Sequence, residues 1–123
     1  MQESPSEGER ELEWLLKKLK PTLSNQRFVF EPTSSLTLDA DMFALIREEE
    51  GVTAIRPAAD GEWARISLGV HSSLGAVGLT AALSRTLAEA GIATNIVAAL
   101  RHDHLFVPWD LRSEALNLLR RLA

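Results

Sequence analysis

The sequence contains no cysteine among its 123 residues. Disulfide bonds, thiolate nucleophiles and cysteine-ligated iron–sulfur clusters are therefore excluded. Long hydrophobic runs are also missing, since no apolar stretch is long enough to cross a bilayer. The opening residues, MQESPSEGERE, lack the basic region and the apolar core of a secretory signal peptide. We therefore expect a cytoplasmic protein without a membrane segment.

Basic residues are outnumbered by acidic residues, 13 to 17, so the formal net charge is -4. No basic stripe is present, which argues against nucleic acid and anionic membranes as partners. Two catalytic and nucleotide-binding motifs are missing as well, namely the Gly-x-Ser-x-Gly elbow of hydrolases and the Lys-Ser/Thr of a phosphate-binding loop. The length and the hydrophobic share of 46% suit one compact domain.

The first half of the chain, residues 9–60, follows a polar, disordered tail expected at residues 1–8. It opens with a helix, because leucines recur at the spacing of one apolar helical face until Pro21 ends the pattern. A strand is predicted at residues 27–31 (RFVFE), followed by a hairpin in MFALIREEEGVTAIRP. We interpret the three glutamates near the tip, around Glu49, as a solvated turn rather than an acid–base or metal site.

The second half, residues 61–123, is predicted to contain a strand, a helix, two strands and a closing helix. The first strand alternates, and its core-facing set is Ala64, Ile66, Leu68 and Val70. The helix after it places Leu79, Leu83 and Leu87 on one face, and Gly91 fits the left-handed position that ends a helix. We expect RHDH to be a tight turn and Asp110 to cap the closing helix.

The second half is one strand short of the ferredoxin-like order β-α-β-β-α-β, and the first half is also incomplete. An unpaired sheet edge beside a packed core would be a liability. We therefore expect the two halves to share strands in one compact α+β body, with an antiparallel sheet packed against helices. A partner chain that supplies the missing strand is the alternative.

The segment ISLGVHSSLGAVGLTAALSRTLAEAGIATNIV resembles the core of an ACT domain, the small ligand-binding module of amino-acid metabolism. Val77 and Gly78 stand where ACT domains have Pro-Gly or a similar pair, and LAEAGI at residues 87–92 follows the family pattern. With VHSSL, VGLTAA and HDHLFVP, the chain also resembles a group of small proteins related to the ACT modules of CASTOR-type arginine sensors. The resemblance implies a ferredoxin-like ACT architecture, in which two incomplete ACT-like halves share one body.

The loop before the central helix carries no charge between His71 and Arg85. The first turn of a helix has backbone N–H groups without intrahelical partners, and these attract a carboxylate or another anion. Gly78 has no side chain to block an approaching ligand, and Ser72 and Ser73 add hydroxyl groups. The same residues are equally suited to capping the helix and packing it closely, so both interpretations stay open.

In ACT domains the effector usually lies between two ACT units and touches this turn, so the resemblance implies a small-molecule site with an amino acid as the candidate ligand. The carboxylate would dock on backbone N–H groups, and the ammonium group would need acceptors. The candidate ligand-binding residues are Ser72, Ser73, Val77, Gly78 and Leu79 for the carboxylate, with Ile96, Val97 and Asp103 for the ammonium group.

Three histidines raise the question of a metal site. His102 and His104 would share one face of an extended strand, and with His71 or Asp103 they could bind zinc. We favour the interpretation that Asp103 and His104 bind the backbone of their own turn. We predict neither a metal nor a cofactor, nor a hydrolase triad of Ser73, His71 and Asp103.

The sequence therefore predicts a non-catalytic, regulatory ACT-type module rather than an enzyme. A sensing module of this length would have to signal through a partner protein or through a homodimer. The alternative is a ligand-free ACT-like scaffold that acts only through protein–protein contacts or self-association.

Overall fold

The strands of the protein form one continuous antiparallel sheet. The computed structural model describes residues 7–71 and 77–122, which contain three α-helices, one 3-10 turn and six strands. In chain order they are α1 (Glu7–Lys17), β1 (Pro21–Thr33), β2 (Ala44–Glu48), β3 (Gly51–Pro57), β4 (Trp63–Leu68), α2 (Leu79–Glu89), β5 (Asn95–Ala98), β6 (Asp103–Pro108), the 3-10 turn η1 (Trp109–Leu111) and α3 (Arg112–Arg120). The strand order is β2-β3-β1-β4-β6-β5. The predicted α+β fold is confirmed.

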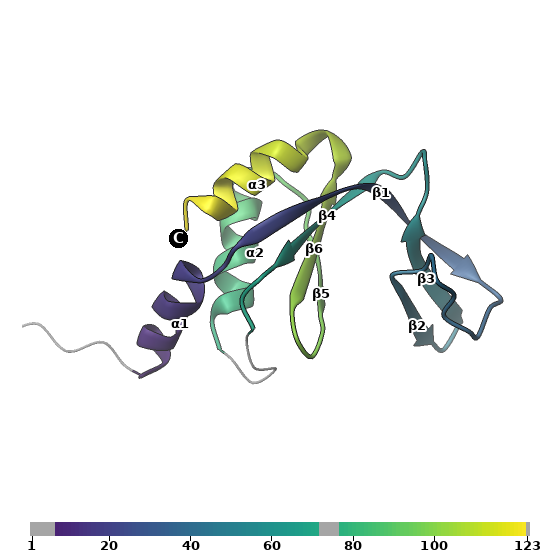
Figure 1. Ribbon diagram of the computed structural model, residues 1–123, viewed down its shortest axis with the longest axis horizontal. Coiled ribbons are helices and arrows are strands. Elements are labelled where there is room, and N and C mark those ends of the chain that lie inside the picture. The colour runs from purple at the N-terminus through teal and green to yellow at the C-terminus, as the bar shows by residue number, and fades with distance from the viewer. Residues whose placement is uncertain (1–6, 72–76, 123) are drawn as a thin grey trace, which may run out of the picture.

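The strand β1 belongs to both halves of the sheet, and Figure 1 shows it crossing the molecule. From Pro21 to Phe28 it pairs with β4, and from Phe28 to Thr33 it pairs with β3. The elements β4, α2, β5, β6 and α3 follow the ferredoxin-like order, and β1 occupies the place of the missing last strand beside β4. The two halves therefore share a strand, as the sequence predicted.

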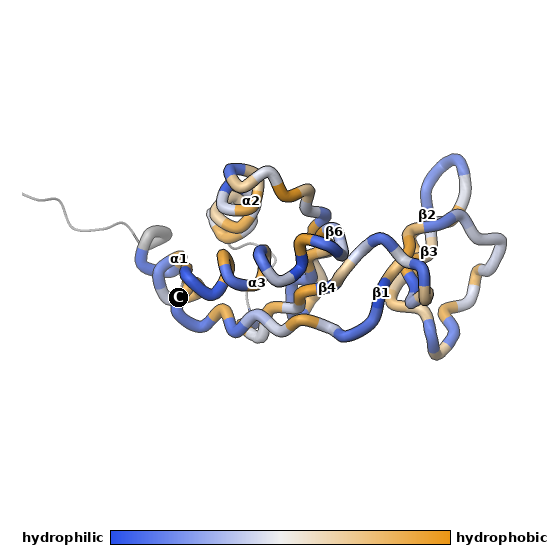
Figure 2. The backbone as a smooth tube through the Cα atoms, turned by 90° about the horizontal axis from the view of Figure 1, so that it is seen from above, coloured by the Kyte–Doolittle hydropathy of each residue, from blue (hydrophilic) through white to orange (hydrophobic). Residues whose placement is uncertain are grey.

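The three helices pack on one face of the second half, and Figures 1 and 2 show them gathered at one end of the molecule, with the β2–β3 hairpin at the other. None of these helices is long and apolar enough to cross a membrane. The buried residues of this helix-side core are Leu15, Leu19, Ala64, Ile66, Leu68, Val70, Leu79, Leu83, Leu87, Ile92, Leu105, Val107, Ala115 and Leu119. The predicted apolar faces of β4 and α2 are thus confirmed.

The opposite face of the sheet is partly covered by the β2–β3 hairpin, because the sheet is strongly curled. Ile55 of β3 packs with Phe28 of β1 and Phe106 of β6 in a second buried cluster. Phe43, just before β2, reaches across to His104 of β6, and their ring centroids are 4.9 Å apart. We call this second side of the sheet the concave face, and define it by the side chains of Phe28, Trp63, Arg65, Ser67, His104 and Phe106.

The boundaries of the first elements differ from the prediction. The helix α1 ends at Lys17 rather than at Pro21, and Lys20 adopts a positive φ of 45° before Pro21 begins β1. The strand β1 spans 13 residues instead of the five predicted at residues 27–31, although its Pro, Ser, Asn and Gln residues disfavour strands. Pairing with a neighbouring strand on each side outweighs this low propensity.

Two predictions for the last hairpin and the closing helix are wrong. Asp103 and His104 belong to β6, because they pair with the ends of β5 and β4, and the turn lies just before them. That turn is closed by the Ala99 N–H, which donates to the His102 carbonyl at 3.1 Å. Asp110 does not cap α3, because it lies within η1 and α3 begins two residues later without a side-chain cap. By contrast, Gly91 has the predicted left-handed conformation, with a φ of 74°.

Candidate ligand site at the start of α2

The predicted ligand turn lies between the end of β4 and the start of α2. Ser72 and Ser73 lie outside the described residues, so the geometry of this end of the site comes from Val77, Gly78 and Leu79. The Val77 side chain is 79% exposed, whereas Leu79 is buried in the helix-side core. Leu79 can therefore contact a ligand only through its backbone.

Gly78 is the N-cap residue of α2 and adopts a left-handed conformation with a φ of 97°. Its carbonyl accepts the first intrahelical hydrogen bond, from the Ala82 N–H at 2.9 Å. Among the described residues, no side chain caps the N–H groups of this first turn. Such donors, together with the positive end of the helix dipole, attract an anion. The left-handed backbone also explains why glycine occupies the position.

Asp103 lies at the same end of the sheet as this turn. Since β6 runs antiparallel to both β4 and β5, the ends of β4 and β5 lie beside the start of β6. Figure 1 shows the start of α2 and the tip of the β5–β6 hairpin together at the lower end of the molecule. The turn and Asp103 therefore lie at the same end of the molecule, although about 25 residues of chain separate them.

Asp103 is only 9% exposed as a residue. Burial raises its pKa, and the positive charge of nearby His102 partly opposes that shift. Within the described part of the chain, no salt bridge neutralises this carboxylate. An ammonium group paired with this carboxylate would stabilise its charged form further than His102 does.

Ile96 and Val97 lie on β5, at one edge of the sheet. The side chain of Ile96 packs on the helix-side core, and that of Val97 packs on the cluster of the concave face. The outer edge of β5 pairs with none of the described strands. The backbone of these two residues, rather than their side chains, is therefore available to a ligand or to a second chain.

The histidines are divided between two places. The rings of His71 and His102 are 6.3 Å apart, and His102 Nδ1 lies 3.4 Å from the Val70 carbonyl oxygen. His104 does not bind its own turn, because its Nδ1 is paired at 2.7 Å with the hydroxyl of Ser67 on the concave face. Over residues 7–71 and 77–122, no three His, Asp or Glu side chains are grouped closely enough to hold a metal ion.

Two surface hollows lie over the first half and contain none of the predicted site residues. One, of about 410 Å³, is lined by Pro32, Thr33, Ser34, Glu48, Glu50, Gly51, Val52 and Thr53. The other, of about 380 Å³, is lined by Asn25, Gln26, Arg27, Pro57, Ala58 and Ala59. The glutamates at the tip of the β2–β3 hairpin are exposed, and Glu48 accepts a hydrogen bond from the Thr53 hydroxyl. This agrees with the interpretation of a solvated turn.

The concave face carries a polar group, formed by Arg65, Ser67 and His104, that was not predicted from the sequence. These residues come from β4 and β6, so no local pattern joins them. The alternation of β4 placed Arg65 and Ser67 away from the core, which on its own suggests exposure to solvent. The sequence signal that could have indicated this group is the pair Phe28 and Phe30. Two aromatic residues on one face of a strand pack against apolar side chains, so this face of the sheet would be expected to be covered.

Sequence models of the ACT domain match the chain twice, once over residues 7–70 and once over residues 59–121. The chain therefore belongs to the ACT domain family. The two matches overlap at residues 59–70, which contain β4, the strand that pairs directly with β1. ACT domains are generally regulatory, non-catalytic modules that bind small molecules, and they often dimerise.

Two solved structures are similar to this chain. VC0802 from Vibrio cholerae, a protein of unknown function described as a possible transport protein, is 34% identical, with a TM-score of 0.77 over 91% of this chain and 95% of that chain. Atu0741 from Agrobacterium tumefaciens is 16% identical, with a TM-score of 0.60 over 77% of this chain and 80% of that chain, and shares the fold alone. No curated protein matches the sequence.

Proposed function

We propose that this ACT-domain protein is a regulatory module that binds a free amino acid at the turn between β4 and α2. The observation that carries the proposal is the first turn of α2, where no described side chain caps the backbone donors and where the buried Asp103 lies at the same end of the sheet. An amino acid has one carboxylate and one ammonium group, so it matches a donor-rich helix start beside a buried carboxylate.

In this proposal the ligand carboxylate docks on backbone N–H groups near Val77, Gly78 and Leu79. A hydroxyl of Ser72 or Ser73 donates a further hydrogen bond. The absence of charged side chains from His71 to Arg85 leaves the turn without a competing carboxylate. The left-handed Gly78 supports this arrangement, because its backbone conformation starts the helix without a side chain over the donors.

The ligand ammonium group pairs with the carboxylate of Asp103, or with backbone carbonyls of β5 at Ile96 and Val97. Burial raises the pKa of the Asp103 carboxyl, and the positive charge of the ligand would lower that pKa again by stabilising the carboxylate. The resemblance to CASTOR-type sensor modules supports an amino acid as the ligand class and residence in the cytoplasm. Regulation would then pass to a partner protein or to a homodimer.

A second candidate function is supported by exposed apolar side chains at the same end of the molecule. Val77 is 79% exposed and Leu100, at the tip of the β5–β6 hairpin, is 64% exposed. Leu100 follows the end of β5 by two residues, and the outer edge of β5 pairs with none of the described strands. Apolar side chains beside a free strand edge suit a protein contact, so a ligand-free scaffold would use this end for association.

The test is a thermal-shift screen of the protein against the common amino acids, followed by calorimetric titration with any that stabilise it. A ligand at a hundredfold over its Kd should add about 2.7 kcal/mol to the free energy of unfolding. If no amino acid binds, the proposal fails. In that event, a dimer or a larger species in analytical ultracentrifugation would support the scaffold function.

A further inference from the structure

The concave face carries a cation that the proposed amino-acid site does not use. The guanidinium carbon of Arg65 lies 5.1 Å from the ring centroid of Phe28 and 5.0 Å from that of Phe43. Rings that flank a guanidinium attract its charge through their faces. They do not accept the in-plane N–H hydrogen bonds through which an arginine binds a carboxylate.

The donors of Arg65 have no partner among the described residues. Its Nε is buried without a hydrogen bond, whereas its two Nη atoms are not buried. Two other stacked arginines differ in this respect. Arg27 and Arg112 both lie over the ring of Trp109, and each donates a hydrogen bond of 2.7 Å to a backbone carbonyl. Arg65 thus has the same aromatic support, and its two Nη groups, which are not buried, keep their donors free for a ligand.

A second polar group stands beside Arg65 on the same face. Ser67 lies two residues along β4, and it pairs across the sheet with His104 of β6. The Ser67 hydroxyl and His104 Nδ1 are 2.7 Å apart. If Nδ1 carries the proton, it donates to Ser67 and frees the hydroxyl hydrogen. If the hydroxyl donates instead, the proton of a neutral imidazole is on Nε2. In either tautomer this pair keeps one donor for a ligand.

Aromatic rings surround these polar groups. The ring of Phe106 lies 5.5 Å from that of Phe28 and 5.4 Å from that of Phe43. Phe30 extends the same row, at 5.2 Å from Phe106, and is 37% exposed. Phe28 and Phe106 are buried, whereas Phe43 is half-buried, so an apolar ligand body could stack on the accessible part of the Phe43 ring beside the arginine.

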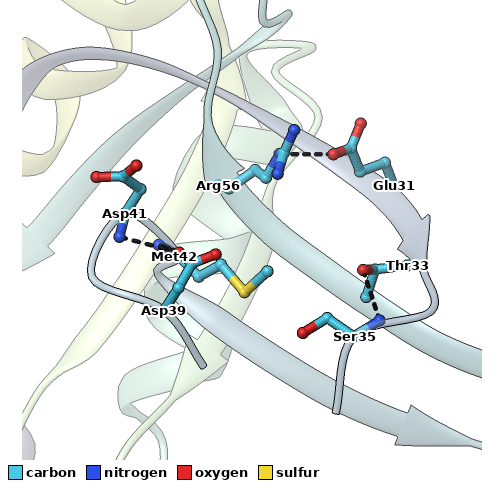
Figure 3. Close-up of polar contacts among 7 residues, drawn as sticks. All are labelled: Glu31, Thr33, Ser35, Asp39, Asp41, Met42 and Arg56. Atoms are coloured by element: carbon cyan, nitrogen blue, oxygen red, sulfur yellow. Dashed lines mark hydrogen bonds and ion pairs between the residues drawn. The ribbon is translucent and has the colours of Figure 1, made fainter. Parts of the chain in front are cut away.

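Phe43 is held over Arg65 by a loop with its own hydrogen bonds. The carboxylate of Asp39 accepts from the backbone N–H groups of Asp41 and Met42, at 3.1 and 3.2 Å, as Figure 3 shows. The next N–H, of Phe43, donates to the carbonyl of Ile55 at 2.8 Å. In the same view, the ion pair between Glu31 and Arg56 joins β1 to β3. The aromatic cover of Arg65 is thus fixed by the backbone of the first half.

We infer that the concave face binds the carboxylate of a small organic anion with an apolar or aromatic body, through the free donors of Arg65. A planar carboxylate matches the fork of a guanidinium, and it is easier to remove from water than a phosphate or sulfate ion. One guanidinium among phenylalanine rings therefore favours an organic acid over a highly charged anion. This inference does not depend on the amino-acid site at the start of α2.

The test is a titration of ¹⁵N-labelled protein with benzoate, followed through the Nε–H resonance of Arg65, which the Arg65→Lys variant identifies by its loss. Benzoate should shift this resonance in a saturable way. Acetate, which lacks the ring, should bind about tenfold more weakly or worse, and benzyl alcohol, which lacks the charge, should leave the resonance in place. No movement with benzoate would overturn the inference.

Two variants separate this site from the rest of the molecule. Arg65→Met keeps an apolar stem and should lose benzoate binding, whereas Arg27→Met, which removes another stacked arginine, should bind as wild type does. Gly78→Ala should also bind benzoate normally, because it alters only the start of α2. Unchanged benzoate affinity in Arg65→Met would overturn the inference. A shift of the Arg65 resonance when only the protein concentration is raised would also overturn the inference. It would mean that a carboxylate of a second copy of the chain binds Arg65.

Discussion

A Cβ atom on Gly78 would lie 3.5 Å from Cδ2 of Leu12, so α1 closes one side of the turn that starts α2. This distance is an ordinary van der Waals contact, and space alone therefore does not require glycine at position 78. The requirement comes from its φ of 97°. The contact also means that the first half of the chain forms part of the surroundings of the proposed amino-acid site.

The Gly78→Ala substitution should weaken amino-acid binding by at least tenfold, about 1.4 kcal/mol. A residue with a Cβ atom is strained at this positive φ, by about 1–3 kcal/mol, and it relieves the strain by moving the N–H groups of the turn. Calorimetric titration with the amino acid found in the screen measures the loss.

The matched control is Gly91→Ala, at the other end of α2. Gly91 also has a positive φ, of 74°, and nothing lies within 4 Å of the place its Cβ would take. This variant should lose stability for the same reason and bind the amino acid as tightly as wild type. If both variants bind normally while folded, the site is not at the start of α2.

Replacing Asp103 with Asn should stabilise the free protein and weaken amino-acid binding. Folding raises the pKa of this carboxyl, because burial disfavours its charged form. The charged carboxylate therefore lowers the free energy of unfolding at neutral pH. This effect disappears below about pH 3.9, where the carboxyl of the unfolded chain is also protonated. Urea unfolding at neutral and at acidic pH measures the gain in stability, and titration calorimetry measures the loss of amino-acid binding.

The control is the exposed Asp110→Asn variant, which should change neither the stability nor the binding. A destabilised Asp103→Asn protein would contradict this account.

The stability of the protein should fall as the pH drops below about 6.5, the ordinary pKa of histidine. Burial lowers the pKa of His104, and the positive charges of Arg65 and His102 lower it further. The unfolded chain therefore binds the proton first. The stability that neutral His104 contributes is complete above the unfolded pKa and is lost as the pH falls through the folded pKa.

Melting temperatures of wild type and His104→Gln between about pH 7.5 and pH 5 test this dependence. The variant should show a shallower decline, because the titrating group is gone. His71→Gln, at an exposed position, serves as the control and should follow wild type. Parallel curves for wild type and His104→Gln would rule out the proposed linkage.

A fragment of residues 61–123 should not fold as a stable monomer, because β1 supplies the strand beside β4. Adding residues 19–33 after the end of α3, through a short flexible linker, should restore cooperative unfolding. Figure 1 shows the C-terminal end of α3 near the start of β1, so such a linker has little distance to span. Circular dichroism during heating compares the two fragments. Cooperative melting of the shorter fragment as a monomer would refute the role of β1.

The sequence predicted much of the second half, because its signals are local. Three leucines spaced by four residues identify the buried face of α2, and alternation identifies the buried face of β4. Such patterns hold wherever an element packs on one core. Gly91 was predictable for a similar reason, since the left-handed end of a helix favours glycine whatever lies around it. The residues of the proposed amino-acid site remain a prediction, with Ser72 and Ser73 outside the described residues.

Other features depended on partners that are distant in the chain. Pro21 begins β1 instead of ending α1, and Asp103 lies in β6 instead of a turn, because a strand extends as far as its neighbours can pair with it. Arg65 alternates like a solvent-facing residue, yet the curl of the sheet brings Phe43 over it. Local sequence patterns were therefore enough to indicate the helices, most of the strands and the family. Which charged groups lack partners depends instead on strand order and on the curvature of the sheet, and no local pattern encodes either.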